Sequence, residues 1–359
     1  MSGKKKQIKK ALESIEKKRA EALKPKRIDG TVSQPSSDFY EDLLSLYKTD
    51  VQLCSSLKII PQVFASLKII LEDIPYDTRG KVSYFNSTSS KILLLLLYFQ
   101  TASPFFITTL TNGKVKTTEQ ILRAVKRAIT LFRNDILDAT IIYRNENFAD
   151  HFTAIVDCTI VRRSHPLTSF SEAKKFYSGK SCCYCYKKEV VVNSITGSAF
   201  YISPGRPGSV HDMVLLKNTS RYIQDIIVDN GILADKGYVG ADSIISSIKI
   251  PSDSECDAEL KSQRSLIERY FGRLKTRFNV LNGVFPLSDE NFDDIFDLCC
   301  GILNLELGDM PLTENDGNVN QILLENIKIE AELKKRKKRE SNAKSRANKK
   351  KRLEKAMGL

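Results

Sequence analysis

The first half of the chain repeats apolar residues at the spacing of helices. The pattern runs over residues 39–47 and 59–71, and residues 90–100 are apolar almost throughout, behind a Ser/Thr cluster suited to capping. Thr117 followed by Gln120 has the spacing of a capping box, which predicts the start of a longer helix. We therefore expect an all-helical segment over about residues 38–145.

The helix that begins after Thr117 is amphipathic and basic. Its outward positions are Arg123, Lys126, Arg127 and Arg133. A helix, a turn containing Gly113 and a basic helix together resemble a helix-turn-helix, whose second helix reads the major groove of DNA. An ordinary packed helix pair has the same pattern and is favoured by the pattern alone. Arg123, Lys126 and Arg127 are the candidate DNA contacts of this segment.

The pattern changes from helices to strands at about residue 150. The predicted elements are strands over 152–161, 190–194 and 199–203, a helix over 213–227, a strand within 231–240, and a helix over 263–281. The second and third strands are close enough to form a hairpin. This order predicts an α/β domain over residues 150–310, with a mixed sheet flanked by helices.

Three acids stand at informative positions of this second half. Asp157 interrupts the first strand, Asp235 ends a later one, and Glu268 lies on the last helix. Each taken singly is more often a strand-end, turn or surface-helix acid. Carboxylates on adjacent strand ends and a covering helix would converge, and they would repel one another without a cation. Mg²⁺ prefers such oxygen ligands, and two ions support in-line phosphoryl displacement.

Two cations share the helical face of Glu268. Arg264 lies four residues before it and Lys275 seven residues after it, so the three side chains lie on one side of the helix. The plain interpretation is a set of helix ion pairs. The functional interpretation is that Arg264 and Lys275 bind phosphates beside the scissile bond.

The positive charge of the chain is unevenly distributed. The net charge is +13, with +7 over residues 1–30 and +10 over residues 326–359, so the residues between them carry −4. We expect a basic helical or disordered tail at 1–30. Residues 326–359 contain few apolar side chains, which predicts a disordered tail. Their two basic clusters favour a nuclear-localisation signal and phosphate contacts over a merely solubilising tail, so we expect a nuclear protein.

Neither a membrane nor a zinc site is indicated. The longest apolar run, residues 92–99, is far shorter than the roughly 20 residues that span a bilayer. Cys182, Cys183 and Cys185 lack the CxxC spacing of zinc sites, which favours ordinary reduced thiols of a strand or loop.

Five motifs follow one another in the second half of the chain. They are IVDCT, FYSGK, YISPGRPGSVHD, LADKGY and RSLIERYFGRLKTRF. In this order they resemble the DDE transposases of eukaryotic PIF/Harbinger elements and their bacterial insertion-sequence relatives, over about residues 152–305 and more weakly over 38–151. The resemblance implies an RNase H-like domain in which Asp157, Asp235 and Glu268 bind two Mg²⁺ or Mn²⁺ ions.

The resemblance leaves two candidates for the second acid. Asp212 of the VHD motif also matches a family position, and we interpret its neighbour His211 as a supporting residue. Asp235 is preferred because the strand order places it beside Asp157, whereas helix capping is an adequate explanation for Asp212. Asp212 is kept as an auxiliary metal ligand. Cys158 stands where the family usually has glycine.

The resemblance implies a transposase that cuts DNA at the ends of a mobile element and joins those ends to a target site. Its partner would be double-stranded DNA, together with a second copy of the chain and an accessory DNA-binding protein. The alternative is a transposase-derived nuclear protein that binds DNA or a partner without cleaving it. The retained acids favour the enzyme.

Overall fold

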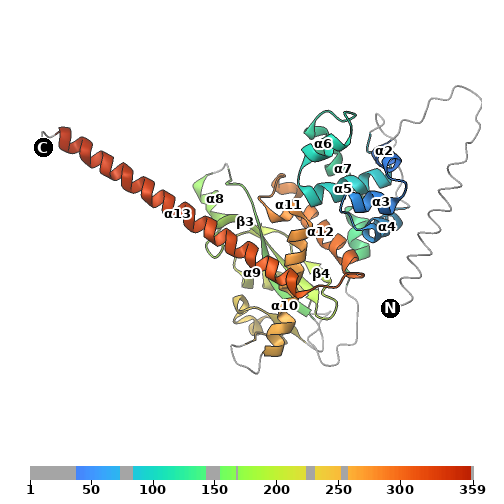
Figure 1. The fold of residues 1–359 in the computed structure, drawn as a ribbon. Coiled ribbons are helices and arrows are strands. Elements are labelled where there is room, and N and C mark those ends of the chain that lie inside the picture. Colours follow the sequence, from blue (N-terminus) through green and yellow to red (C-terminus); the bar gives the residue numbers. More distant parts are fainter. Residues whose placement is uncertain are drawn as a thin grey trace, which may run out of the picture.

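The computed structural model describes residues 38–72, 84–142, 154–166, 169–223, 231–251 and 258–356 (Figure 1). The predicted N-terminal tail, residues 1–30, lies outside this range. Within the described part of the chain, no helix combines the length and apolar character needed to cross a membrane.

The segment before the sheet is helical, as its sequence predicted. Its helices are α2 (Phe39–Leu46), α3 (Asp50–Ser56), α4 (Pro61–Ile70), α5 (Thr88–Thr101), α6 (Pro104–Leu110) and α7 (Thr118–Thr140). The Ser87 hydroxyl accepts a hydrogen bond from the backbone N–H of Ser90 and caps α5. Thr117 and Gln120 form the predicted capping box of α7. These local signals determine where both helices begin.

A mixed β-sheet forms the centre of the second half. Its strands are β1 (Ala154–Arg162), β2 (Tyr177–Ser178), β3 (Cys183–Asn193), β4 (Ala199–Ile202), β5 (Arg206–Pro207), β6 (Ile232–Ala234) and β7 (Ile248–Lys249). The main path is β2-β3-β1-β6-β7, and β4 and β5 also pair with β3. β1 is antiparallel to β3 and parallel to β6. The predicted hairpin between β3 and β4 is confirmed.

Helices cover both faces of the sheet. Ala154 and Val156 pack into one apolar cluster with α9 (Asp212–Ile223), whereas Ile155 between them packs into the other. This alternation is the normal consequence of strand geometry. Four further helices of this half of the chain are α8 (Phe170–Lys175), α10 (Ala258–Arg277), α11 (Asn279–Asn282) and α12 (Phe292–Leu307). The architecture is the predicted α/β one and is consistent with an RNase H-like domain.

The N-terminal helices share one core with the sheet. The larger cluster includes residues from α2 to α7 together with residues of β1, β3, α10 and α12. The ring of Phe99 meets that of Phe278, with centroids 6.5 Å apart. Arg133, expected to point outward, instead forms ion pairs with Asp294 at 2.6 Å and Asp297 at 3.3 Å on α12. The helical and α/β segments are therefore joined by both apolar and ionic contacts.

The C-terminal segment differs from the sequence prediction. A disordered tail was predicted over 326–359, but as far as residue 356, where the described part of the chain ends, this segment belongs to a single helix. This helix, α13 (Glu314–Ala356), packs along α10 and then projects from the body (Figure 1). Lys, Arg, Glu and Ala favour helices intrinsically, and Arg336 and Glu340 form an i,i+4 pair at 3.6 Å. Arg273 of α10 holds Asp316 at 2.7 Å, which fixes the start of α13.

Candidate active site

The strand register brings Asp157 and Asp235 to neighbouring positions. β1 and β6 run parallel with Val156 opposite Ala234. Asp157 is the next residue of β1 and Asp235 directly follows the end of β6, so both follow this pair at the same edge of the sheet. Asp235 also precedes a short 3-10 helix, Lys236–Tyr238. The adjacency of the two strands, predicted from their order, is confirmed.

Helix α10 supplies Glu268 and its cationic neighbours. Nη1 of Arg264 lies 2.8 Å from Oε1 of Glu268 and 3.9 Å from Oδ1 of Asp235. Arg264 therefore links two of the three predicted catalytic acids. Lys275 is only 5% exposed and makes no hydrogen bond or ion pair within the described residues.

Asp212 lies at the start of α9 and is neutralised by a lysine. Nζ of Lys187 on β3 is 2.8 Å from Oδ1 of Asp212. A Cβ added to Gly237 would lie 2.8 Å from Oδ2 of Asp212, so the turn after Asp235 packs closely against this carboxylate. The exposed His211 accepts a hydrogen bond at Nδ1 from the backbone N–H of Met213, which gives it a role in starting α9.

All four acids line one cavity of about 260 Å³. Asp157, Asp212, Asp235 and Glu268 share it with four cations, which are Lys180, Lys187, Arg264 and Lys275. Burial raises the pKa of Asp157 to about 7, and the nearby charges of Asp235 and Asp212 act in the same direction. The backbone N–H of Cys158 and the charge of Arg264 oppose this rise. The cavity thus gathers mutually repelling carboxylates that a cation would stabilise.

The donor type of this cavity fits a hard divalent ion. Carboxylate oxygens are the ligands that Mg²⁺ and Mn²⁺ prefer. In the described residues, however, no three His, Cys, Asp or Glu side chains stand close enough to hold one ion. Arg264 and Lys187 ion-pair with three of the acids and compensate part of their charge. Binding a metal would require these ion pairs to open.

A buried polar cluster begins at Cys158, the residue next to Asp157. Cys158 Sγ lies 3.2 Å from the hydroxyl oxygen of Tyr238, and that hydroxyl donates to Glu189 at 2.9 Å. Glu189 stands opposite Cys158 in the β1–β3 pairing. The sequence pattern did not identify Glu189 or Lys187, because strand β3 was predicted to begin only at residue 190. An earlier predicted start of β3, together with the alternation of side chains along a strand, would have indicated both Lys187 and Glu189.

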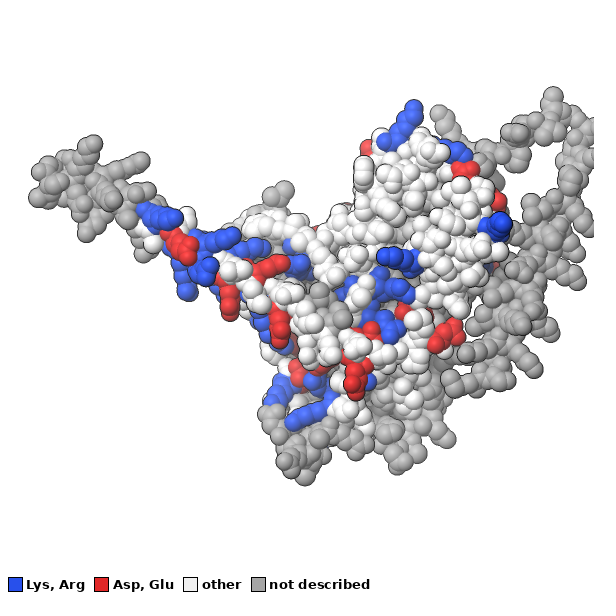
Figure 2. All heavy atoms as spheres, viewed as in Figure 1, with Lys and Arg blue, Asp and Glu red and all other residues white. Residues whose placement is uncertain are grey.

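The predicted basic face of α7 is present. Arg123, Lys126 and Arg127 are exposed, and Arg123 forms a loose pair with Glu119 at 3.8 Å. Figure 2 shows Lys and Arg side chains interspersed with acidic ones along the described part of α13. DNA recognition by either surface stays a prediction.

Residues 156–304 match the family model of a DDE superfamily endonuclease. The match contains Asp157, Asp212, Asp235 and Glu268, and it covers less than half of the chain. Among solved structures, the piggyBac transposase in a synaptic complex with hairpin DNA is similar at 9% identity and a TM-score of 0.34. That alignment covers 79% of this chain and 81% of the other. No curated protein matches the chain.

Proposed function

We propose that the protein is a metal-dependent DNA transposase of the PIF/Harbinger type. It would cut phosphodiester bonds at the ends of a mobile element and join those ends to target DNA. The observation that carries the proposal is the cavity lined by Asp157, Asp235 and Glu268, within the part of the chain that matches a DDE endonuclease.

The residues of the cavity divide into two chemical roles. Asp157, Asp235 and Glu268 would hold Mg²⁺ or Mn²⁺, with Asp212 as an auxiliary ligand. When bound, two such ions activate the attacking oxygen and stabilise the leaving one in an in-line displacement. Arg264 and Lys275 would then bind phosphate oxygens of the DNA.

In this proposal, Arg264 would exchange its carboxylate partners for a phosphate when a metal binds. Its guanidinium pairs with Glu268 at 2.8 Å and lies 3.9 Å from Asp235. Metal binding to these carboxylates would release the guanidinium, which is a strong bidentate partner for phosphate. Metal and DNA would therefore reinforce each other's binding.

Cleavage of the DNA that flanks the gene, with Mg²⁺ or Mn²⁺ added, tests the nuclease proposal. We expect wild-type protein to nick the terminal-repeat DNA and Glu268→Gln to leave it intact. Glu290→Gln, at an exposed acid outside the cavity, is the matched control and should cleave as wild type does. Equal cleavage by wild type and Glu268→Gln, or none by either, would refute the enzyme.

Metal binding has a readout that does not depend on cleavage. Mn²⁺ should raise the melting temperature of wild-type protein, because a ligand that binds only the folded state stabilises it. Asp157→Asn should remove this rise, whereas Glu290→Gln should retain it. An equal rise in Asp157→Asn would exclude Asp157 as a ligand.

The remaining parts of the proposal concern partners and location. Exposed Arg123, Lys126 and Arg127 would contact duplex DNA from α7. Transposition handles two DNA ends together, so we expect a homodimer, with an accessory DNA-binding protein as a further partner. The basic residues 326–359 would direct the protein to the nucleus.

A further inference from the structure

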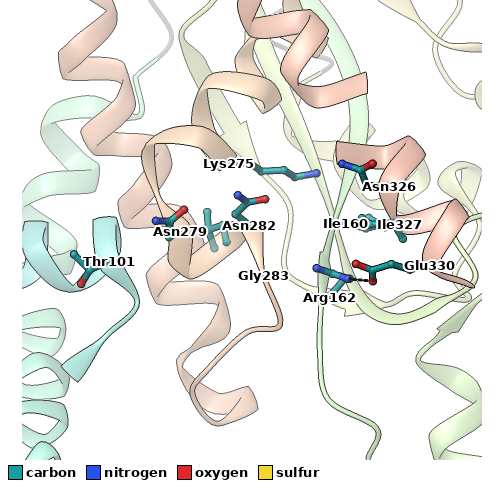
Figure 3. A pocket seen from close by; sticks show the side chains of 11 residues that line it. Thr101, Ile160, Arg162, Lys275, Asn279, Asn282, Gly283, Asn326, Ile327 and Glu330 are labelled. Carbon is teal, nitrogen blue, oxygen red and sulfur yellow. Dashed lines mark hydrogen bonds and ion pairs between the residues drawn. The ribbon is translucent and has the colours of Figure 1, made fainter. Parts of the chain in front are cut away.

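A second cavity adjoins the acidic one and has different chemistry. It measures about 460 Å³ and shares Ile160 and Lys275 with the acidic cavity. Its other walls come from the ends of β1 and α5, from α11, and from α13 (Figure 3). Its size falls in the range of about 300–1,000 Å³ typical of sites for compact ligands.

Two cations in this cavity have unused binding capacity. Lys275 is 5% exposed and makes no hydrogen bond or ion pair among the described residues, and the charge that acts on it most strongly is that of Asp157 in the acidic cavity. Arg162 Nε is buried without a hydrogen-bond partner, although Nη1 of the same side chain is paired. A buried ammonium without a close counter-charge, like a buried N–H without an acceptor, is costly to maintain in a folded protein. These two side chains therefore indicate an anionic ligand.

The rest of the wall suits a nucleobase. Asn279, Asn282 and Asn326 contribute amides, each of which has both donors and acceptors, and Ile160 and Ile327 contribute apolar surface. Asn amides pair well with base edges. The backbone N–H of Phe285 donates to the carbonyl of Arg162 at 2.8 Å, which keeps the loop after Asn282 beside the end of β1.

The anion position is now taken by a side chain of the protein itself. Oε2 of Glu330 on α13 accepts a hydrogen bond from Nη1 of Arg162 at 2.9 Å (Figure 3). The same helix places Gln321 in the wall of the acidic cavity. α13 thus lines both cavities, and its carboxylate lies where a phosphate would bind Arg162.

We propose that this cavity binds one unpaired nucleotide of a DNA strand, with its phosphate between Lys275 and Arg162, and that Glu330 competes for that phosphate. The base would lie against the asparagine amides. Because the two cavities adjoin, the strand would pass from this nucleotide to the acids. The choice of DNA as ligand rests on the proposed function, whereas the anion-binding character of the cavity does not.

The test measures binding of a short fluorescein-labelled oligothymidylate to the full chain by anisotropy, without divalent metal. Glu330→Gln should bind about two- to fivefold tighter than wild type, the range expected for removing one partner of an exposed ion pair. Glu332→Gln is the matched control, since it removes the same charge from an exposed position of α13 that does not line the cavity. Equal affinity of the two variants would overturn the competition.

A second variant tests the cation. Arg162→Gln should weaken binding and lower the slope of log affinity against log salt by about 0.7, the value for one phosphate contact on a single strand. Arg221→Gln, at an exposed residue of α9, should leave the slope closer to wild type. An unchanged slope in Arg162→Gln would refute the phosphate site. If Arg162→Gln does not fold, the comparison of Glu330 with Glu332 still decides.

An abasic strand of the same length distinguishes a nucleotide from phosphate alone. Asn282→Ala should weaken binding of the oligothymidylate several-fold and leave binding of the abasic strand unchanged. Equal effects on both strands would overturn the base assignment. If Glu330→Gln binds the oligothymidylate more tightly but the wild-type protein cleaves no DNA, the nucleotide site is supported and the nuclease is refuted. If the wild-type protein cleaves DNA but Glu330→Gln binds no more tightly, the nuclease is supported and the nucleotide site is refuted.

Discussion

Replacing Glu189 by glutamine should stabilise the protein at neutral and alkaline pH. Glu189 is fully buried on β3, and burial raises its pKa from 4.5 to about 7, with the charges of Asp212 and Asp157 adding to the rise. At about 1.4 kcal/mol for each tenfold change in proton affinity, this corresponds to about 3 kcal/mol. The hydroxyl of Tyr238, which donates to Glu189 at 2.9 Å, can still donate to the glutamine oxygen.

The direction of this pH dependence follows from which state of the chain, folded or unfolded, holds the proton of Glu189 more tightly. Below pH 4.5 the Glu189 carboxyl is protonated in the folded and the unfolded chain, and its full contribution to stability is present. As the pH rises to about 7, the unfolded chain loses this proton more readily than the folded one, so the free energy of unfolding falls. Glu189→Gln removes this loss. Asp157 titrates in both proteins, so the difference between them reports Glu189 together with its coupling to Asp157.

Urea unfolding followed by circular dichroism at about pH 4 and about pH 8 measures this difference. We expect the two proteins to agree at the lower pH and Glu189→Gln to be more stable by up to about 3 kcal/mol at the higher. Glu306→Gln is the matched control. Glu306 is also buried, but Arg273 and Arg277 hold it at 3.2 and 2.8 Å, so its neutralisation should destabilise. Equal destabilisation of both variants at about pH 8 would refute the reasoning.

Three further perturbations test packing and charge. Gly208→Ala places a Cβ 2.4 Å from Cys185 Sγ and 2.8 Å from a backbone carbonyl oxygen, so it should lower the free energy of unfolding by about 1–3 kcal/mol in urea melts. Gly179→Ala is the control, because its Cβ would meet nothing within 4 Å, and it should not lower the stability. Asn304→Ala removes the amide that donates to the carbonyls of Thr140 and Ala199, and a loss of less than about 1 kcal/mol would contradict its role in joining the two segments. Deleting residues 345–359 should reduce both the duplex affinity and its salt dependence in fluorescence titrations, and an unchanged salt slope would exclude this segment from DNA contact.

Local patterns were sufficient to predict most elements. The capping box at Thr117 and the cap at Ser87 mark the starts of α7 and α5, since side-chain hydrogen bonds to nearby backbone depend only on adjacent residues. The strand order was sufficient to place Asp157 beside Asp235, because parallel neighbours present equivalent ends to the same edge.

Contacts between distant residues were not predictable in the same way. The sequence gives no reason for Arg133 to turn toward Asp294, and the pairing appears only when α7 packs against α12. The sequence shows that Arg264 and Glu268 share a helical face, but it does not show that Arg264 also approaches Asp235. The helix α13 was missed because a high density of like charge was given more weight than the helix propensity of the residues that carry it.

The shared core has a consequence for how the molecule unfolds. Phe99 of α5 packs against Phe278 beside α11, and a Cβ at Gly301 of α12 would meet Thr140 and Ile136 of α7 at 2.5 and 3.4 Å. Neither segment can separate without exposing apolar surface to water. The helices α2 to α7 and the sheet should therefore melt in one cooperative transition, and a fragment that begins at residue 150 should aggregate instead of folding on its own.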